Sequence, residues 1–166
     1  MTEIISIIAD LALTLSLIVA LVFGIAQVRA AKRDRRERFT LETLRNFQTR
    51  EFAEFINYIA TRTLPSSRKE LEALPVTEQV VFIQLAQQME SLGLLVAEKY
   101  IDIDLVDKTL GSFVITAWEK YKKIFLSIRE QDPFIGEYFQ WLAEQIDKRM
   151  KESPRKPFFE STSIAG

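Results

Sequence analysis

An uncharged run of eighteen residues near the N-terminus constrains this chain more than any other feature. Leu11 to Val28 carries no formal charge, and the next ten residues hold six basic side chains against only Asp34 and Glu37. As a helix, the run would be roughly 27 Å long, close to the ~30 Å hydrocarbon core of a bilayer. It therefore predicts a transmembrane anchor over residues 1–28, followed by a basic juxtamembrane helical stalk over residues 29–48.

The uneven charge around the run predicts its orientation. The residues before Asp10 include Glu3 but no Lys or Arg, whereas the basic residues follow the run. The positive-inside rule then puts the N-terminus outside the cell inner (cytoplasmic) membrane and the C-terminal domain of this single-pass protein in the cytoplasm. Basic residues near a membrane surface also contact anionic lipid headgroups. The expected headgroup contacts are Arg29, Lys32, Arg33, Arg35, Arg36 and Arg38.

The run has two other interpretations. A cleaved signal peptide needs basic residues ahead of its apolar stretch and small residues at a cleavage site, but here the basic cluster follows the stretch. A buried helix of a soluble domain is the other alternative. The uncleaved anchor explains both the length of the run and the position of the basic cluster.

Small residues recur within the predicted anchor at every fourth position. Side chains with this spacing lie on one helix face, and small ones let two helix backbones approach closely in lipid. We therefore expect this face to pack against another transmembrane helix, either from a second copy or from a different membrane subunit. The face consists of Ala12, Ser16, Ala20 and Gly24.

The composition excludes several classes of chemistry. Cysteine and histidine are both absent, so disulfides, zinc sites of the Cys or His type, cysteine nucleophiles and Ser-His-Asp triads cannot form. The five glycines are scattered and form no phosphate-binding loop. No catalytic or cofactor-binding residue is predicted, and no cofactor is expected.

An acidic cluster between Glu98 and Asp107 is the one candidate for a metal site. A calcium loop starting at Asp102 would need Gly at its sixth position and Glu at its twelfth, but these positions hold Asp107 and Phe113. No metal site is therefore predicted. Asp102 or Asp104 is better explained as the N-cap of a helix.

Net charge argues against nucleic acid as a partner. Residues 1–38 contain six basic and four acidic side chains, a balance of +2, and the whole chain has −1, so the remaining 128 residues carry −3. Nucleic-acid binding requires clustered Lys and Arg on the binding domain. We therefore expect membrane lipids and another transmembrane helix as partners, and no nucleic acid.

Helical periodicity continues after the stalk and predicts an all-α fold. The chain is expected to form a small cytoplasmic helical bundle over residues 49–150, ending in a flexible tail over residues 151–166. Thr49 and Ser67 are predicted N-caps, the latter in a capping box with Glu70. The predicted helices of the bundle cover residues 50–63, 77–98, 104–110, 112–130 and 133–150.

The helix predicted over Thr77–Glu98 has two apolar faces, so it should lie at the centre of the bundle. Glu90 lies in the middle of one of these faces and should be at least partly buried. A buried carboxylate needs a partner. The candidates are Arg62, Arg129 and Trp118, and the alternative is an ordinary solvated glutamate. Trp118 and Trp141 belong to apolar stripes and are expected in the core.

Several segments together resemble a known family. They are FQTREF over residues 47–52, MESLGLLVAEKYIDIDLV over 89–106, Trp118, and FQWLAEQI over 139–146, all following a lone membrane helix and a basic stalk. This order resembles the bacterial proteins grouped as domain of unknown function 4760. The resemblance implies a membrane-anchored, all-helical cytoplasmic domain, and it implies no reaction.

Two classes of function follow from these features. The preferred one is a non-enzymatic, membrane-anchored interaction protein, a scaffold or accessory subunit of a membrane complex. The alternative is an oligomeric pore-forming membrane effector, since polar residues in a membrane segment often mark a function. In that case the pore would be lined by Asp10, Thr14, Ser16 and Gln27.

Overall fold

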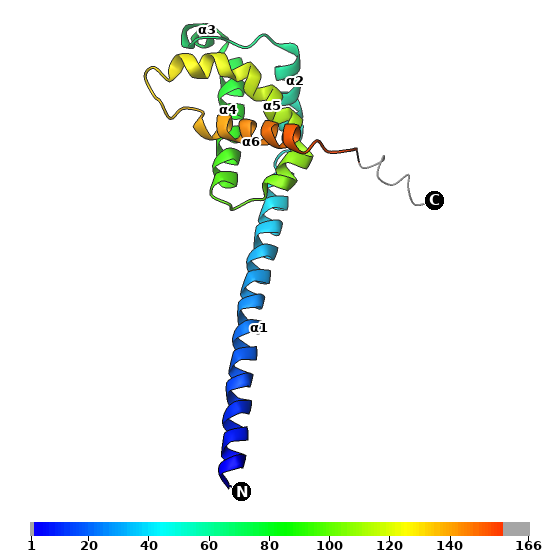
Figure 1. Cartoon of the computed structure of the whole chain (residues 1–166). Helices are drawn as coiled ribbons and strands as arrows, with labels where there is room; N and C mark the ends of the chain where they lie inside the picture. The colour runs from blue at the N-terminus through cyan, green and yellow to red at the C-terminus, as the bar shows by residue number, and fades with distance from the viewer. Residues whose placement is uncertain (1, 158–166) are drawn as a thin grey trace, which may run out of the picture. The chain divides into compact units, whose positions relative to one another are not determined.

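The computed structural model describes residues 2–157, apart from the side chains of residues 2, 6 and 8–10. Within this range the fold is all-α, as the sequence predicted, and contains no strand (Figure 1). The chain divides into two compact units after Phe39. The helices are α1 (Thr2–Arg45), α2 (Arg50–Thr61), α3 (Arg68–Glu72), α4 (Val76–Ala97), α5 (Ile103–Ile128) and α6 (Glu137–Glu152).

The first unit consists of α1 up to Phe39. All side chains from Leu11 to Arg35 are exposed, including the large apolar ones. Among the described residues, two helices are long and apolar enough to cross a membrane, namely α1 from Leu11 and α4. They differ in burial, because none of the apolar window of α1 is buried whereas a third of that of α4 is.

The second unit begins at Thr40, earlier than the predicted start of the bundle at residue 49. Thr40 and Leu44 are buried in it, and the Thr40 hydroxyl accepts a hydrogen bond of 2.9 Å from the backbone N–H of Asp102. The last turns of α1 therefore belong to the bundle and not to the stalk. The predicted boundary follows the N-cap at Thr49, whereas the second unit begins inside α1.

The core of the second unit lies among α4, α5 and α6, and α2 adds the buried Phe52, Phe55 and Ile59. Figure 1 shows α6 lying across α4, and α6 also packs against α5. As predicted, α4 is central and buries both of its apolar faces. Its buried side chains are Phe82, Leu85, Met89, Leu92 and Val96, together with Gly93.

An aromatic cluster fills the space between these three helices. Tyr121 has no exposed surface, stacks on Phe82 at 4.3 Å between ring centres, and donates a hydrogen bond of 3.0 Å to the backbone carbonyl of Phe82. Burial, with a smaller contribution from Tyr58, raises the pKa of the Tyr121 phenol above its ordinary value. Trp118 is buried as predicted, whereas Trp141 is only half-buried.

The predicted N-caps are confirmed. Thr49 caps α2 through the N–H of Phe52 at 3.2 Å, and Ser67 caps α3 through the N–H of Glu70 at 3.3 Å. Of the two candidates for the cap of α5, it is Asp102 that accepts a hydrogen bond from the N–H of Asp104, at 2.8 Å. These caps can be predicted from the sequence because a cap and its donor lie within three residues of each other.

The predicted break at Gly111 was wrong, because α5 runs without interruption from Ile103 to Ile128. Gly111 has a packing role instead. A Cβ atom at this position would lie only 2.5 Å from Asp107 Oδ1 and 3.2 Å from Ile146 Cγ2 of α6. A glycine in this helix therefore serves close helix packing and does not end the helix.

Both ends of α6 also differ from the prediction. The helix begins at Glu137 and not at Pro133, because Gly136 before it has a left-handed φ of 67°. It extends to Glu152, past the predicted start of the tail at residue 151. Arg155 then donates to the carbonyl and carboxylate of Asp107 at 3.0 and 3.2 Å. The rest of the predicted tail, residues 158–166, lies outside the described residues.

Gly93 sets the distance between α4 and α6. A Cβ atom at this position would lie 2.2 Å from the backbone oxygen of Tyr138 and 2.6 Å from its carbonyl carbon. Because both are backbone atoms at the start of α6, they can move away only if the helix itself moves. The glycine therefore allows the closest approach between these two helices.

Replacing Gly93 by Ala should lower the unfolding free energy of the second unit by about 2 to 3 kcal/mol, since overpacking here displaces backbone. Both tryptophans lie in this unit, so tryptophan fluorescence of the full chain in detergent reports its unfolding alone. Gly24→Ala is the matched control, because no atom lies within 4 Å of its added Cβ. Equal stability of the two variants would contradict the close approach.

Candidate functional site

The carboxylate of Glu90 binds the N-terminus of α6. It accepts hydrogen bonds from the backbone N–H groups of Tyr138, at 3.2 Å, and Phe139, at 2.9 Å. These are the second and third residues of the helix, whose N–H groups have no partner within the helix itself. The N-cap residue, Gly136, has no side chain to accept them. Glu90 of α4 therefore supplies the cap that α6 lacks.

Glu90 is half-buried, but its partners differ from the candidates named from the sequence. Among the described residues, none of Arg62, Arg129 and Trp118 is hydrogen-bonded to it; the two backbone N–H groups are. Arg129 instead donates to the carbonyls of Ile135 and Gly136, each at 2.9 Å.

Arg129 holds the loop before α6 through hydrogen bonds to its backbone carbonyls. Its guanidinium also donates to the side chain of Gln140 and lies 5.8 Å from the ring centre of Trp118. The cation thus contacts carbonyl oxygens and an aromatic face, both of which attract positive charge. The start of α6 is held by a carboxylate from α4 and by a guanidinium from the end of α5.

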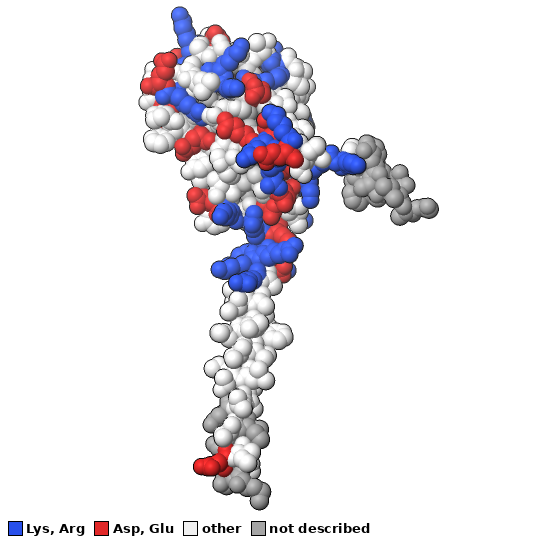
Figure 2. Space-filling model, in the orientation of Figure 1, with Lys and Arg blue, Asp and Glu red and all other residues white. Residues whose placement is uncertain are grey.

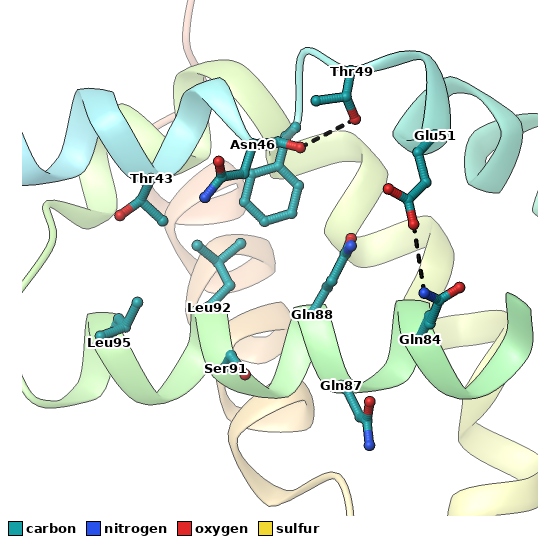
Figure 3. A pocket seen from close by; sticks show the side chains of 11 residues that line it. Thr43, Asn46, Thr49, Glu51, Gln84, Gln87, Gln88, Ser91, Leu92 and Leu95 are labelled. Carbon is teal, nitrogen blue, oxygen red and sulfur yellow. Dashed lines mark hydrogen bonds between the residues drawn. The ribbon is translucent and has the colours of Figure 1, made fainter. Parts of the chain in front are cut away.

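A groove lined mostly by polar residues lies between the α1–α2 junction and α4. It has a volume of about 590 Å³. Figure 3 shows Gln84, Gln88 and Leu92 pointing from α4 toward this junction, whereas Gln87 points away. The lining residues are Thr43, Asn46, Phe47, Thr49, Glu51, Gln84, Gln87, Gln88, Ser91, Leu92 and Leu95.

The walls of this groove carry mainly neutral hydrogen-bonding groups. Glu51 supplies its one carboxylate, which accepts a hydrogen bond of 3.5 Å from Gln84 (Figure 3). The side-chain oxygen of Gln88 is buried and has no hydrogen-bond partner among the described residues. Amides and hydroxyls of this kind bind uncharged polar groups, and they include neither a nucleophile paired with a base nor a cluster of metal ligands.

A second hollow, of about 400 Å³, lies where α5 meets the end of α6. Asp107 is buried there and forms an ion pair with Arg155, while the more exposed Asp104 pairs with Arg149. These pairs join the acidic cluster noted in the sequence to the C-terminal part of the bundle. Within residues 2–157, no group of three acidic residues is placed to hold a metal ion.

The predicted packing face of the anchor is exposed on α1. Its members Ala12, Ser16, Ala20 and Gly24 all lie on the surface of the helix. The Ser16 hydroxyl donates to the backbone carbonyl of Ala12 at 2.8 Å, so its polar group is satisfied within the helix. Around Ala20 and Gly24 the small side chains leave a shallow hollow of about 460 Å³, which extends to Arg29 and Lys32.

The basic residues expected at lipid headgroups gather in a short part of α1. Figure 2 shows them as blue side chains at one end of the white, uncharged stretch of this helix. Arg36 is half-buried, and Arg33 pairs with Glu37 at 2.8 Å. The exposed members are Arg29, Lys32, Arg33, Arg35 and Arg38.

Comparison with known proteins gave one result. The model of a family described as "Domain of unknown function (DUF4760)" matches residues 6–146. The match covers most of the chain and includes both compact units. Neither the search of curated proteins nor the search of solved structures gave a match.

Replacing Glu90 by Lys should lower the unfolding free energy of the second unit by about 2 to 4 kcal/mol. The change removes two charge-assisted hydrogen bonds and places a positive charge at the positive end of α6. Glu90→Ala should cost less, about 1 to 2 kcal/mol, because it removes only the cap. Glu98→Lys, at the exposed C-cap residue of the same helix, is the control and should change stability by no more than ~0.5 kcal/mol. If Glu90→Lys behaved like this control, the cap would contribute nothing.

Proposed function

The chain belongs to the family described as domain of unknown function (DUF4760), as its sequence resemblance indicated, and we propose that it is a non-enzymatic, membrane-anchored interaction protein. It would act as a scaffold or accessory subunit of a membrane complex. The observation that carries the proposal is the exposed, uncharged segment of α1 from Leu11 to Val28.

Solvation energy supports a membrane environment for this segment. Leu15, Leu17 and Phe23 each expose more than three fifths of their surface. Apolar surface in water costs about 25 cal/mol per Å², a cost that lipid removes. A bilayer also explains why charge is absent over eighteen residues, because a charged side chain at the centre of a membrane helix costs at least about 2.5 kcal/mol.

The basic residues after the segment support the proposed orientation. Their concentration on one side of the apolar stretch favours a cytoplasmic location for the second unit by the positive-inside rule. Lipid headgroups are the proposed partners of the exposed members such as Arg29 and Lys32, whose charges attract anionic lipid. We propose the cell inner membrane as the membrane that holds this segment.

The proposed interaction role rests on the chemistry that the chain offers. It has no Cys or His, and the groove beside α4 is lined mainly by amides and hydroxyls. The pore-forming alternative has less support from the anchor, because the Ser16 hydroxyl is bonded to its own helix and Leu, Ile and Val cover most of the remaining surface. A groove that offers hydrogen-bonding groups, in a chain without Cys or His, fits a scaffold better than an enzyme.

Membrane attachment and orientation can be tested on the full chain. We expect it to stay in the membrane pellet after alkaline carbonate extraction, and a protease added to intact spheroplasts should leave residues 40–157 uncut until lysis. Replacing Leu17 and Leu21 by Asp should release the protein, because two carboxylates in the apolar stretch oppose insertion. Extraction of the unchanged chain by carbonate would overturn the anchor, and digestion from outside would overturn the orientation.

The packing face of the anchor gives a separate prediction. Replacing Ala20 and Gly24 together by Ile should release a partner transmembrane helix, because the added side chains prevent close backbone approach. Native mass measurement or crosslinking in mild detergent would detect the loss. Leu17→Ile with Leu21→Ile is the matched control, since it adds no bulk on the packing face. An assembly that survives the Ala20 and Gly24 changes would place the contact elsewhere.

A further inference from the structure

One face of α4 is exposed along the whole helix and is apolar at both ends. Val76, Val80, Ile83 and Leu94 lie on it and expose 73%, 47%, 43% and 40% of their surfaces. Their spacing follows the 3.6-residue period, so they form a single stripe opposite the buried face. Gln87 lies on the same stripe, near its middle, and is also exposed. We call these five residues the α4 stripe.

Between Val76 and Ala97 this face of α4 has no fully exposed charged side chain, and the exposed Glu98 lies just beyond the end of the helix. The two charged residues of the helix, Glu78 and Glu90, are half-buried, and the carboxylate of Glu90 is bound to α6. The outer faces of α5 and α6 differ, since they expose Lys122, Lys123 and Lys148. Depletion of charge together with exposed apolar side chains is typical of the centre of an interface between proteins.

We propose that the α4 stripe binds the same stripe of a second copy of this chain. In a two-fold symmetric contact, the same surface of each copy faces its counterpart on the other copy. The surface must therefore be complementary to itself. A charged residue at the centre would meet a like charge, whereas a glutamine amide both donates and accepts hydrogen bonds and can pair with its own copy. Gln87 points away from the groove, as Figure 3 shows, and is free to face such a partner.

The size of the stripe explains how such a contact would depend on the membrane. A helix of 22 residues is roughly 33 Å long and about 10 Å wide, which gives on the order of 300 Å² per copy. Stable complexes in solution bury about 800 Å² per partner, so this contact alone is too small. Two copies anchored in one membrane have a raised effective concentration, which compensates for weak binding. The inference therefore rests on the proposed anchoring.

Single cysteines test the contact cleanly, because the chain has none of its own. The full chain carrying Gln87→Cys, in native membranes, should form a covalent dimer with a short bismaleimide crosslinker. Lys123→Cys, at an exposed residue on α5, is the matched control and should give at least about tenfold less dimer, a factor equal to ~1.4 kcal/mol at 25 °C. Equal crosslinking at both positions, or none at Gln87→Cys, would overturn the proposal.

A charge exchange identifies the partner as a second copy. Gln87→Lys and Gln87→Glu place like charges opposite each other, so each variant expressed alone should give less dimer by native mass measurement after extraction in mild detergent. Coexpression of the two should restore a mixed dimer, because the charges are then opposite. Each variant is also tested for retention in the membrane pellet. Retention without restoration would overturn the α4 contact alone, whereas loss of retention in the unchanged chain would overturn the proposed anchoring.

The crosslinked product also distinguishes other occupants of the stripe. A product whose mass is not twice that of the chain would assign the stripe to a different protein and overturn the proposal. Transfer of a lipid-borne photoreactive group to the stripe, with no dimer, would assign it to the membrane surface and overturn it equally. A dimer at Gln87→Cys that persists when Ala20 and Gly24 are replaced by Ile supports a contact made by α4 itself.

Discussion

The bundle depends on the contact between Glu90 and the first N–H groups of α6. A helix that starts after a glycine has no side-chain cap, and uncapped N–H groups inside a protein cost free energy comparable to a lost hydrogen bond. Glu90 provides two acceptors from another helix, and Gly93, one turn further along α4, lets the backbone of Tyr138 come close enough to use them. Both residues hold the start of α6 close to α4.

The position of α6 in turn determines the rest of the core. Phe139, Leu142 and Ile146 of this helix are fully buried against α4 and α5. Arg129 fixes the preceding loop, and Arg149 and Arg155 tie the far end of the helix and the segment after it to Asp104 and Asp107. The polar contacts thus lie at the two ends of α6, and the apolar contacts lie between them.

Features encoded within a few residues were predictable from the sequence. The caps at Thr49, Ser67 and Asp102, the all-α class and the central position of α4 follow from short spacings and from helical periodicity. The partial burial of Glu90 was predictable for the same reason. Its partner was not, because sequence patterns identify side chains that can pair with a carboxylate, whereas its actual donors are backbone N–H groups 48 and 49 residues away.

The wrong break at Gly111 and the place of Thr40 in the second unit both have a physical cause. Glycine weakens a helix by propensity alone, but in α5 it makes room for Ile146, so tertiary packing outweighs the local preference. Thr40 falls in the predicted stalk because the bundle is expected to begin at the N-cap Thr49. Its hydroxyl is bonded to the N–H of Asp102, a contact over 62 residues that no local pattern shows. The groove beside α4 could not be predicted from the sequence either, because its walls come from distant segments.

Glu90 has a further consequence during biosynthesis. α4 is apolar and long enough to be taken for a second membrane span, and it is synthesised before α6, which covers it in the folded protein. A carboxylate near the middle of such a span costs about 3 kcal/mol for insertion by the translocon. In a membrane-anchored chain, the residue that caps α6 after folding would therefore also oppose insertion of α4 before α6 is synthesised.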